Sequence, residues 1–172
     1  YIEEELKRNE KYCVFYIVPS RALINQVSEE LRIEIPNITV KNAFIENEII
    51  EDDKLIFVIT PERAVKIINS DKGLTLPNLI FIDEIQNVEN EDGRGNLFEY
   101  VYEELSKVDK TKIITAGPFI SNSDEIFKEL FNKSSKSVIT DLSPVFQLRT
   151  IIKLESDFVS LTLFVNNKVR YD

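Results

Sequence analysis

The chain has 172 residues, 43% of them apolar, with one cysteine and no histidine. These numbers allow one buried core and exclude a disulfide framework, a Ser-His-Asp triad and any histidine-ligated metal site. The net charge of −9 argues against strong nucleic-acid binding, except at a local basic patch, and without an apolar span or signal peptide we expect a cytoplasmic protein.

Short apolar runs alternate with helical patterns along the first half of the chain. Residues 12–18 and 55–59 are continuous apolar runs, as expected for strands covered on both faces of a sheet. Ser20 follows the first run in the position of a helix N-cap. Thr60-Pro61-Glu62 follows the second run, with a cap, a proline and an acid in the order that begins a helix. A shorter strand is expected at residues 38–40.

The second half continues the alternation. The further strands that we expect are residues 79–82, 112–115, 138–140 and 145–154. Helices are expected after the polar loop 93–95 and after Ser123. Residues 161–165 and 168–171 flank Asn166-Asn167, which predicts a β-hairpin. Repeated strand-helix-strand units predict an α/β fold with a parallel sheet flanked by helices.

Polar residues follow the predicted strands where each strand ends. They are Ser20, Arg21, Thr60, Arg63, Asp83, Glu84 and Thr115. Ligands of open parallel sheets bind beyond the carboxyl ends of the strands, so these residues would share one functional edge. Taken singly, each of them is also what a helix cap or a turn requires.

Asp83 and Glu84 directly follow a buried strand and form the sharpest candidate site. Two adjacent carboxylates allow two roles, one holding Mg²⁺ on a nucleotide and the other orienting or deprotonating the attacking water. As a dipeptide they are also ordinary stabilisers of a first helical turn, because carboxylates favour helix N-termini.

Four segments, in order, resemble motifs of superfamily 2 helicases. Leu79-Ile-Phe-Ile-Asp-Glu-Ile-Gln86 is similar to motif II, in which D-E-x-H or D-E-A-D follows an apolar strand. Pro19-Ser-Arg-Ala-Leu-Ile-Asn-Gln26 resembles motif Ia and Thr60-Pro-Glu-Arg63 resembles the T-P-E element. Thr115-Ala116-Gly117 resembles the S-A-T of motif III.

Two further segments look like the DExH branch that includes the superkiller RNA helicase and archaeal DNA-repair helicases. They are Gly93-Arg94-Gly95, followed by a helix, and Ser143-Pro144-Val145. The resemblance covers nearly the whole chain. It implies a RecA-like sheet of the P-loop NTPase class, the first motor domain of a helicase that uses ATP and Mg²⁺.

The resemblance also implies roles for single residues. Asp83 would coordinate the Mg²⁺ bound to ATP, Glu84 would contact the nucleotide and act as catalytic base, and Gln86 would relay the nucleotide state to Thr115. The residues implied to contact the backbone of a single strand are Ser20, Arg21, Thr60, Pro61 and Arg63. A solvated helix residue is the alternative for Arg63, and an ordinary surface residue the alternative for Gln86.

The implied partners are nucleic acid and a second domain. The nucleic acid would be single-stranded or partly duplex, with DNA slightly favoured over RNA. The second RecA-like domain would belong to the same protein. We expect residues 1–153 to form the partial RecA-like domain and residues 154–172 to form a hairpin or linker toward that second domain.

The sequence departs from the family pattern in three ways. None of the four glycines begins the phosphate-binding motif G-x-x-x-x-G-K-S/T, so these residues alone should not hydrolyse ATP. We expect a chain truncated before motif Ia, lacking the first strand, with an exposed sheet edge near the motif III strand. Gln86 replaces the usual His, and Gly117 replaces the usual Thr of motif III.

The leading functional hypothesis is therefore a fragment of a helicase that couples ATP hydrolysis to single-strand translocation and unwinding. One alternative is the motor of a restriction or remodelling translocase, which uses the same motifs without separating strands. The other is a degenerate motor fold that serves as a nucleic-acid-binding scaffold.

Overall fold

The structure of the chain is a computed structural model that describes residues 1–43, 53–69, 76–89, 94–108, 110–118, 123–138, 148–154, 159–165 and 168–171. The chain divides into two compact units, Tyr1–Ser135 and Lys136–Asp172. Among the described residues, no helix has both the length and the apolar character needed to cross a membrane.

The first unit is built on a five-stranded parallel sheet. Its strands are β1 (Tyr12–Ile17), β2 (Thr39–Lys41), β3 (Lys54–Ile59), β4 (Leu79–Ile82) and β5 (Lys112–Thr115). They lie in the order β2-β3-β1-β4-β5, and every neighbouring pair is parallel. The predicted α/β fold with a parallel sheet is therefore confirmed.

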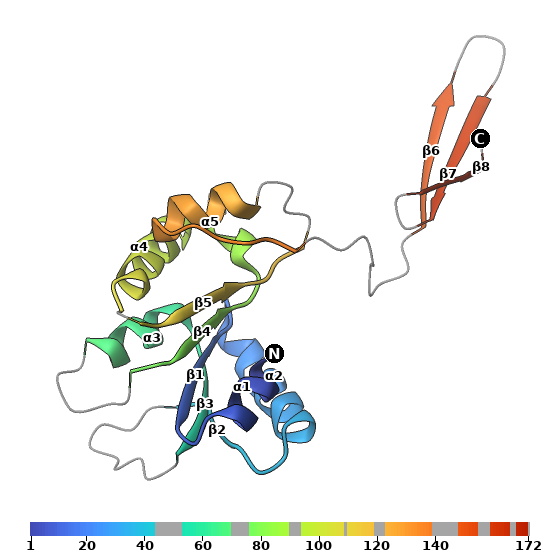
Figure 1. The fold of residues 1–172 in the computed structure, drawn as a ribbon. Helices are drawn as coiled ribbons and strands as arrows, with labels where there is room; N and C mark the ends of the chain where they lie inside the picture. Colours follow the sequence, from blue (N-terminus) through green and yellow to red (C-terminus); the bar gives the residue numbers. More distant parts are fainter. Residues whose placement is uncertain are drawn as a thin grey trace. The chain divides into compact units, whose positions relative to one another are not determined.

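Helices cover both faces of this sheet. They are α1 (Ile2–Arg8), α2 (Arg21–Glu34), α3 (Pro61–Ile68), α4 (Arg94–Ser106) and α5 (Ser123–Phe131), with a short 3-10 helix η1 (Ile85–Glu89) after β4. Helices α1 and α2 lie on one face, and α3, α4 and α5 lie on the other (Figure 1). The result is a three-layered α/β/α arrangement.

Two apolar cores follow from the alternation of side chains along the strands. Phe15 and Phe57 face the α3–α5 side, where their rings meet edge to face with centroids 5.6 Å apart. Val14 and Ile56 face the α1–α2 side. All four are buried because both faces of the central strands are covered, which explains why the runs are continuously apolar.

Strand β5 is the last strand of the order and lies at the sheet edge. Lys112 is exposed, and Ile113 and Ile114 are only partly buried, unlike the isoleucine and valine residues of β1 and β3, which are all buried. The sheet edge that we expected at the motif III strand is therefore present among the described strands. An edge of this kind leaves backbone groups available for pairing with another strand.

The second unit is an antiparallel sheet of β6 (Leu148–Leu154), β7 (Val159–Val165) and β8 (Lys168–Tyr171). The pairing of β7 with β8 confirms the predicted hairpin. We expected the first domain to extend to residue 153, whereas β6 pairs with β7 along its whole length and belongs to the second unit. Aliphatic side chains of this sheet are exposed, for example Leu154 at 81%.

The helix after the predicted polar loop begins earlier than expected. It starts at Arg94, so Gly95 lies within α4, while Gly93 is outside the described residues. Buried Phe98, Val101, Tyr102 and Leu105 anchor this helix at helical spacing. Of the expected strand 138–140, Val138 is exposed and not in a strand, and residues 139–140 lie outside the described residues, as do 143–147.

Candidate functional site

The carboxyl ends of four strands lie level with one another. In the strand register Ile17 pairs with both Ile59 and Ile82, and Ile82 pairs with Thr115. The residues at and after these positions therefore share one edge, which we call the carboxyl rim. It comprises Ser20–Arg21, Thr60–Arg63, Asp83–Gln86 and Thr115–Ala116. The site residues predicted from the sequence all lie at or just after these strand ends, and their roles stay predictions.

Asp83 is fixed to the tip of β1 by its backbone, because its N–H donates to the Ile17 carbonyl at 3.0 Å. Its Oδ1 atom accepts a hydrogen bond from the Glu84 N–H at 3.0 Å. Partial burial raises the pKa of the Asp83 carboxyl and the Glu84 charge adds to this, while the hydrogen bond from the Glu84 N–H and the nearby Tyr16 hydroxyl act in the opposite direction. A half-buried carboxylate with free acceptor positions results.

Glu84 occupies the left-handed backbone region, with φ of 52°. This conformation costs a non-glycine residue about 1–3 kcal/mol and persists only where neighbouring contacts enforce it. Asn87 supplies such contacts, because its side-chain amide donates to the Glu84 carbonyl at 2.9 Å and to Glu84 Oε2 at 3.2 Å. The exposed Glu84 carboxylate is therefore held beside Asp83 rather than left to rotate freely.

The segments after β4 and β5 are joined through the backbone of Ala116. Its N–H donates to the Ile82 carbonyl at 2.8 Å, and its carbonyl accepts the Ile85 N–H at 3.0 Å. Thr115 lies beside Ile82 and is partly buried. A displacement of the residues around Glu84 would therefore be transmitted directly to the segment that follows Thr115.

Gln86 has a side-chain oxygen that is buried and accepts no hydrogen bond from the described part of the chain. A buried acceptor without a donor is costly, by about 1–3 kcal/mol. Such a group in a partly buried residue of the carboxyl rim is suited to a donor that arrives with a ligand or another domain. Gln86 is partly buried, and its proposed role stays a prediction.

Ser20 and Thr60 occupy the N-cap positions of α2 and α3, as predicted. In the residues described, neither side chain makes a capping hydrogen bond to its helix. The first-turn amides of both helices point toward the carboxyl rim, where they favour an anionic ligand. Pro61 is buried at the first position of α3, and Arg21 is exposed at the start of α2.

Arg63 is partly buried and is not a freely solvated helix residue. Its guanidinium donates to the carbonyl of Asn42 at 3.3 Å, and the Asn42 side chain donates to Asn25 Oδ1 at 3.4 Å. Asn42 directly follows β2, so these bonds link α3, the end of β2 and α2 along one side of the carboxyl rim.

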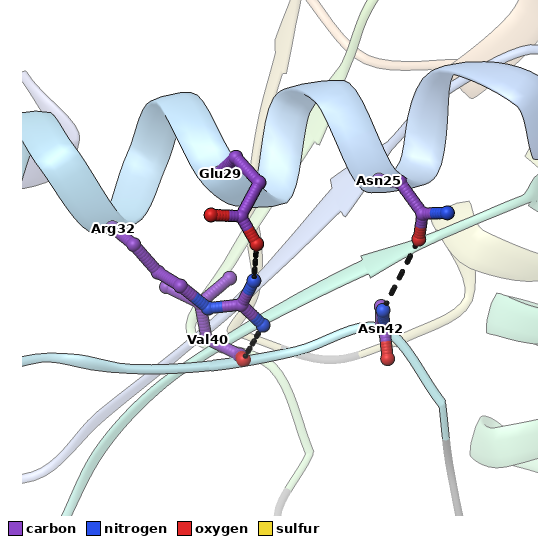
Figure 2. A network of polar contacts seen from close by, with 5 residues as sticks. All are labelled: Asn25, Glu29, Arg32, Val40 and Asn42. Carbon is purple, nitrogen blue, oxygen red and sulfur yellow. Dashed lines mark hydrogen bonds and ion pairs between the residues drawn. The ribbon is translucent and has the colours of Figure 1, made fainter.

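A second pair of bonds fixes the end of β2 against α2. Arg32 donates to Glu29 Oε1 at 2.6 Å and to the Val40 carbonyl at 2.9 Å. Figure 2 shows Asn25, Glu29 and Arg32 projecting from α2 toward this segment. The carboxyl rim is thereby held in place at its β2 end by side chains of one helix.

The donor set at the carboxyl rim fits a nucleotide-bound Mg²⁺ better than a metal held by protein alone. The described residues contain no group of three or more His, Cys, Asp or Glu side chains close enough to hold a metal ion. Mg²⁺ bound with substrate phosphates usually takes only one or two carboxylates and keeps several waters. The Asp83 carboxylate retains acceptor positions for such an ion or its water.

Three residues of this site were not recognised in the sequence. In the sequence, Tyr16 is one residue of the buried strand predicted at 12–18. Asn42 lies shortly after the strand predicted at 38–40. Asn87 lies three residues after Glu84, and that spacing is the signal that could have revealed it, since asparagine side chains often bond nearby backbone groups in turns.

The fold and the carboxyl rim together define a RecA-like domain of the P-loop NTPase class, in which helices cover a parallel sheet and acidic residues follow a central strand. The family model of the DEAD/DEAH box helicases matches residues 1–126. The chain therefore belongs to the DEAD/DEAH box helicase family. None of the curated proteins is a significant match to it.

Solved structures similar to the chain include two of Dbp5 from S. cerevisiae. One is a Dbp5 variant bound to Nup159, a Gle1 variant, IP6 and ADP, with 17% identity and a TM-score of 0.53, covering 74% of this chain and 35% of the other. The second is a Dbp5 variant bound to a Gle1 variant and IP6, with 18% identity and a TM-score of 0.53, covering 77% and 35%. The chain thus spans about a third of these proteins, and at this identity the likeness shows the fold alone.

Proposed function

We propose that the chain is part of the first motor domain of an ATP-dependent nucleic-acid helicase of the DExH branch. The observation that supports this most is the level register of β3, β1, β4 and β5. It brings two adjacent carboxylates and the starts of two uncapped helices to one rim, so nucleotide and nucleic acid would bind to neighbouring parts of a single rigid sheet.

Asp83 and Glu84 divide the hydrolytic role between them. Asp83 is anchored by β1 and would hold Mg²⁺, directly or through water, while the more exposed Glu84 would accept a proton from the attacking water or orient it. Mg²⁺, when bound with ATP, neutralises the charge that develops on the phosphates. The bonds from Asn87 to Glu84 support this division, because they keep the base in one place.

Gln86 and Thr115 communicate the state of the nucleotide. The unsatisfied oxygen of Gln86 is ready to accept a donor from the second RecA-like domain or the nucleotide. Thr115 moves with the same element, because Ala116 bonds to both sides of the Asp83-Glu84 turn. Gln86 and Gly117 differ from the usual family residues, and this favours, as the second candidate, a translocase that moves without separating strands.

The nucleic-acid strand contacts the other half of the carboxyl rim. The proposed contact residues are Ser20, Arg21, Thr60, Pro61 and Arg63. Helix N-termini bind phosphates through backbone amides, so binding does not require a basic protein surface. The slight preference for DNA over RNA remains a prediction, which competition between DNA and RNA strands of the same sequence tests.

The decisive experiment is Glu84→Gln in the complete protein. Removal of a catalytic base should lower ATP turnover about 10²- to 10⁴-fold while ATP binding is retained. Glu129→Gln, an exposed acid on α5, is the matched control and should leave turnover unchanged. Equal turnover in both variants and the unmodified protein would eliminate the catalytic assignment and favour the scaffold.

Strand displacement separates the helicase from the translocase. A helicase should release a labelled strand from a partial duplex at a rate that depends on ATP. A translocase should show ATP turnover stimulated by nucleic acid but no strand release. The 172 residues by themselves contain no phosphate-binding loop, so purified on their own they should show no ATPase activity above background.

A further inference from the structure

The strands of the second unit are basic, although the chain as a whole is acidic. The whole chain has 21 basic and 30 acidic residues, whereas Lys136–Asp172 has five basic and four acidic residues. No acidic residue lies within β6, β7 or β8. The strands hold four of the five basic residues of the unit, which are Arg149, Lys153, Lys168 and Arg170. Positive charge is therefore concentrated in this small sheet.

The pairing of β6 with β7 places two kinds of residue on the two faces of the sheet. On one face, which we call the apolar face, Ile152 pairs with Leu161 and Leu154 pairs with Val159. Side chains alternate between the faces along a strand, so the residues between these pairs belong to the other face. We call this other face the basic face, and it comprises Arg149, Ile151, Lys153, Ser160, Thr162 and Phe164.

Both faces of this sheet have accessible residues. On the basic face Lys153 is exposed and Ser160 is partly buried. On the apolar face Ile152 is 61% exposed and Leu161 is 52% exposed. The described part of Lys136–Asp172 contains no helix, so the unit covers neither face with a layer of its own. The two faces suit different partners, the apolar face a protein surface and the basic face an anionic ligand.

We propose that the basic face binds the sugar-phosphate backbone of a single nucleic-acid strand. Lysine and arginine side chains neutralise phosphates, and serine and threonine hydroxyls donate hydrogen bonds to phosphate oxygens. Arg149 and Lys153 are four residues apart on one strand, roughly 13 Å along it, so they suit two separate phosphates of an extended chain better than one small anion. The proposal rests on the nucleic-acid partner proposed above and adds a contact outside the carboxyl rim.

The composition of the basic face favours nucleic acid over an acidic peptide. Arg149 pairs in register with Phe164, and basic residues beside an aromatic residue are the combination that binds single strands without sequence preference. An acidic peptide would use the positive charges alone. A basic face of this kind also explains how a chain with a net charge of −9 binds a polyanion, because the attraction of phosphates depends on the local charge.

The test measures the binding of labelled oligo(dT) by the 172-residue chain, using fluorescence anisotropy at several salt concentrations. The basic-face variant is Arg149→Gln combined with Lys153→Gln. The matched control is Lys128→Gln combined with Lys133→Gln, which removes two exposed lysines of the first unit and changes the net charge equally. Circular dichroism verifies that both variants keep their secondary structure.

The basic-face variant should bind oligo(dT) more weakly than the control variant. The slope of the logarithm of affinity against the logarithm of salt concentration should become less steep by about 1.4, because each phosphate contact on a single strand contributes about 0.7. The change should be the same for oligo(dA), since phosphate contacts carry no sequence information. The proposal is overturned if the two variants have equal slopes, or if polyglutamate displaces oligo(dT) as effectively as unlabelled oligo(dT) does.

Ile152→Thr combined with Leu161→Thr tests the apolar face of the same sheet. Threonine favours strands, so the pairing of β6 with β7 should persist. This variant should bind oligo(dT) like the unmodified chain. A loss as large as that of the basic-face variant would overturn the assignment of binding to the basic face.

Arg21→Gln at the carboxyl rim separates failure of this proposal from failure of the proposed function. If Arg21→Gln weakens binding of oligo(dT) and the basic-face variant does not, only the role of the basic face is wrong. If the basic-face variant weakens binding and Arg21→Gln does not, the role of Arg21 is wrong and the basic face stands. If the unmodified chain does not bind oligo(dT) even at low salt, the role of the basic face is wrong.

Discussion

The two ends of the parallel sheet differ in how completely their polar groups are satisfied. At the amino end, Asn78 joins three strands: it accepts the Cys13 N–H at 2.8 Å on its side chain, donates to the Cys13 carbonyl at 2.8 Å and accepts the Lys112 N–H at 3.0 Å. The Thr111 hydroxyl donates to Pro77 nearby at 2.6 Å. These bonds hold the strand starts in register.

At the carboxyl rim, several groups are strained or lack a partner. Glu84 has a positive φ, and the Gln86 oxygen is buried without a donor in the described structure. Ser20 and Thr60 stand at helix starts that they do not cap. The hydrogen bonds at the amino end therefore stabilise the sheet, whereas the residues of the carboxyl rim keep conformations that reduce stability, as residues at functional sites often do.

The largest change in the free energy of unfolding is expected for a substitution at the amino end of the sheet. Asn78→Ala removes the acceptor of the buried Cys13 N–H and should lower the free energy of unfolding by about 1–2 kcal/mol. Urea denaturation of the 172-residue chain followed by circular dichroism measures it. Asn78→Asp, which keeps an acceptor oxygen, is the control and should lose less; equal losses would mean that the hydrogen bond is unimportant.

At the carboxyl rim, Glu84→Gly should raise the free energy of unfolding. Glycine adopts positive φ without the steric cost of a Cβ atom, so the variant should gain about 0.5–1 kcal/mol in unfolding free energy despite losing the contact with Asn87. The same denaturation experiment tests it. A loss of stability would show that the Asn87 bonds outweigh the backbone strain.

Asp83→Asn should give a smaller gain in stability, and this gain should depend on pH. Because the folded-state pKa of Asp83 is raised, its charge opposes folding above that pKa, and the penalty vanishes below the unfolded-state value of about 3.9. The variant should therefore be more stable at pH 7 by a few tenths of a kcal/mol, since solvent screens a half-exposed group, and no more stable at pH 3. Thermal melting at the two pH values tests this, and a gain that is the same at both would contradict it.

Ser20→Ala should have the smallest effect on stability. Loss of a working N-cap costs about 0.5–2 kcal/mol, but Ser20 makes no capping bond, so the change should be below about 0.3 kcal/mol. If Ser20 contacts a phosphate, single-strand binding by the complete protein should nevertheless weaken, as measured by fluorescence anisotropy. A loss near 1 kcal/mol in unfolding would show instead that Ser20 is an ordinary cap.

Much of the fold was predictable from local pattern. The continuous apolar runs predicted β1, β3 and β4, and Thr60-Pro61-Glu62 predicted the start of α3. The start of α4 was missed because Gly95, a poor helix former, lies within it, where buried neighbours such as Phe98 hold the helix in place. That β6 belongs to the second unit was missed, because the residues of a strand do not show which other strand it will pair with.

The amino-acid sequence was enough to predict β1, β3 and β4, the start of α3 and the order of the motifs, because these depend on side-chain spacing and on caps within a few residues. It also placed Asp83-Glu84 at the end of a strand. Only the tertiary structure decided that Ile17, Ile59, Ile82 and Thr115 end level. It alone placed the Tyr16 ring against the Phe81 ring, because this contact joins residues far apart in sequence through the register of neighbouring strands.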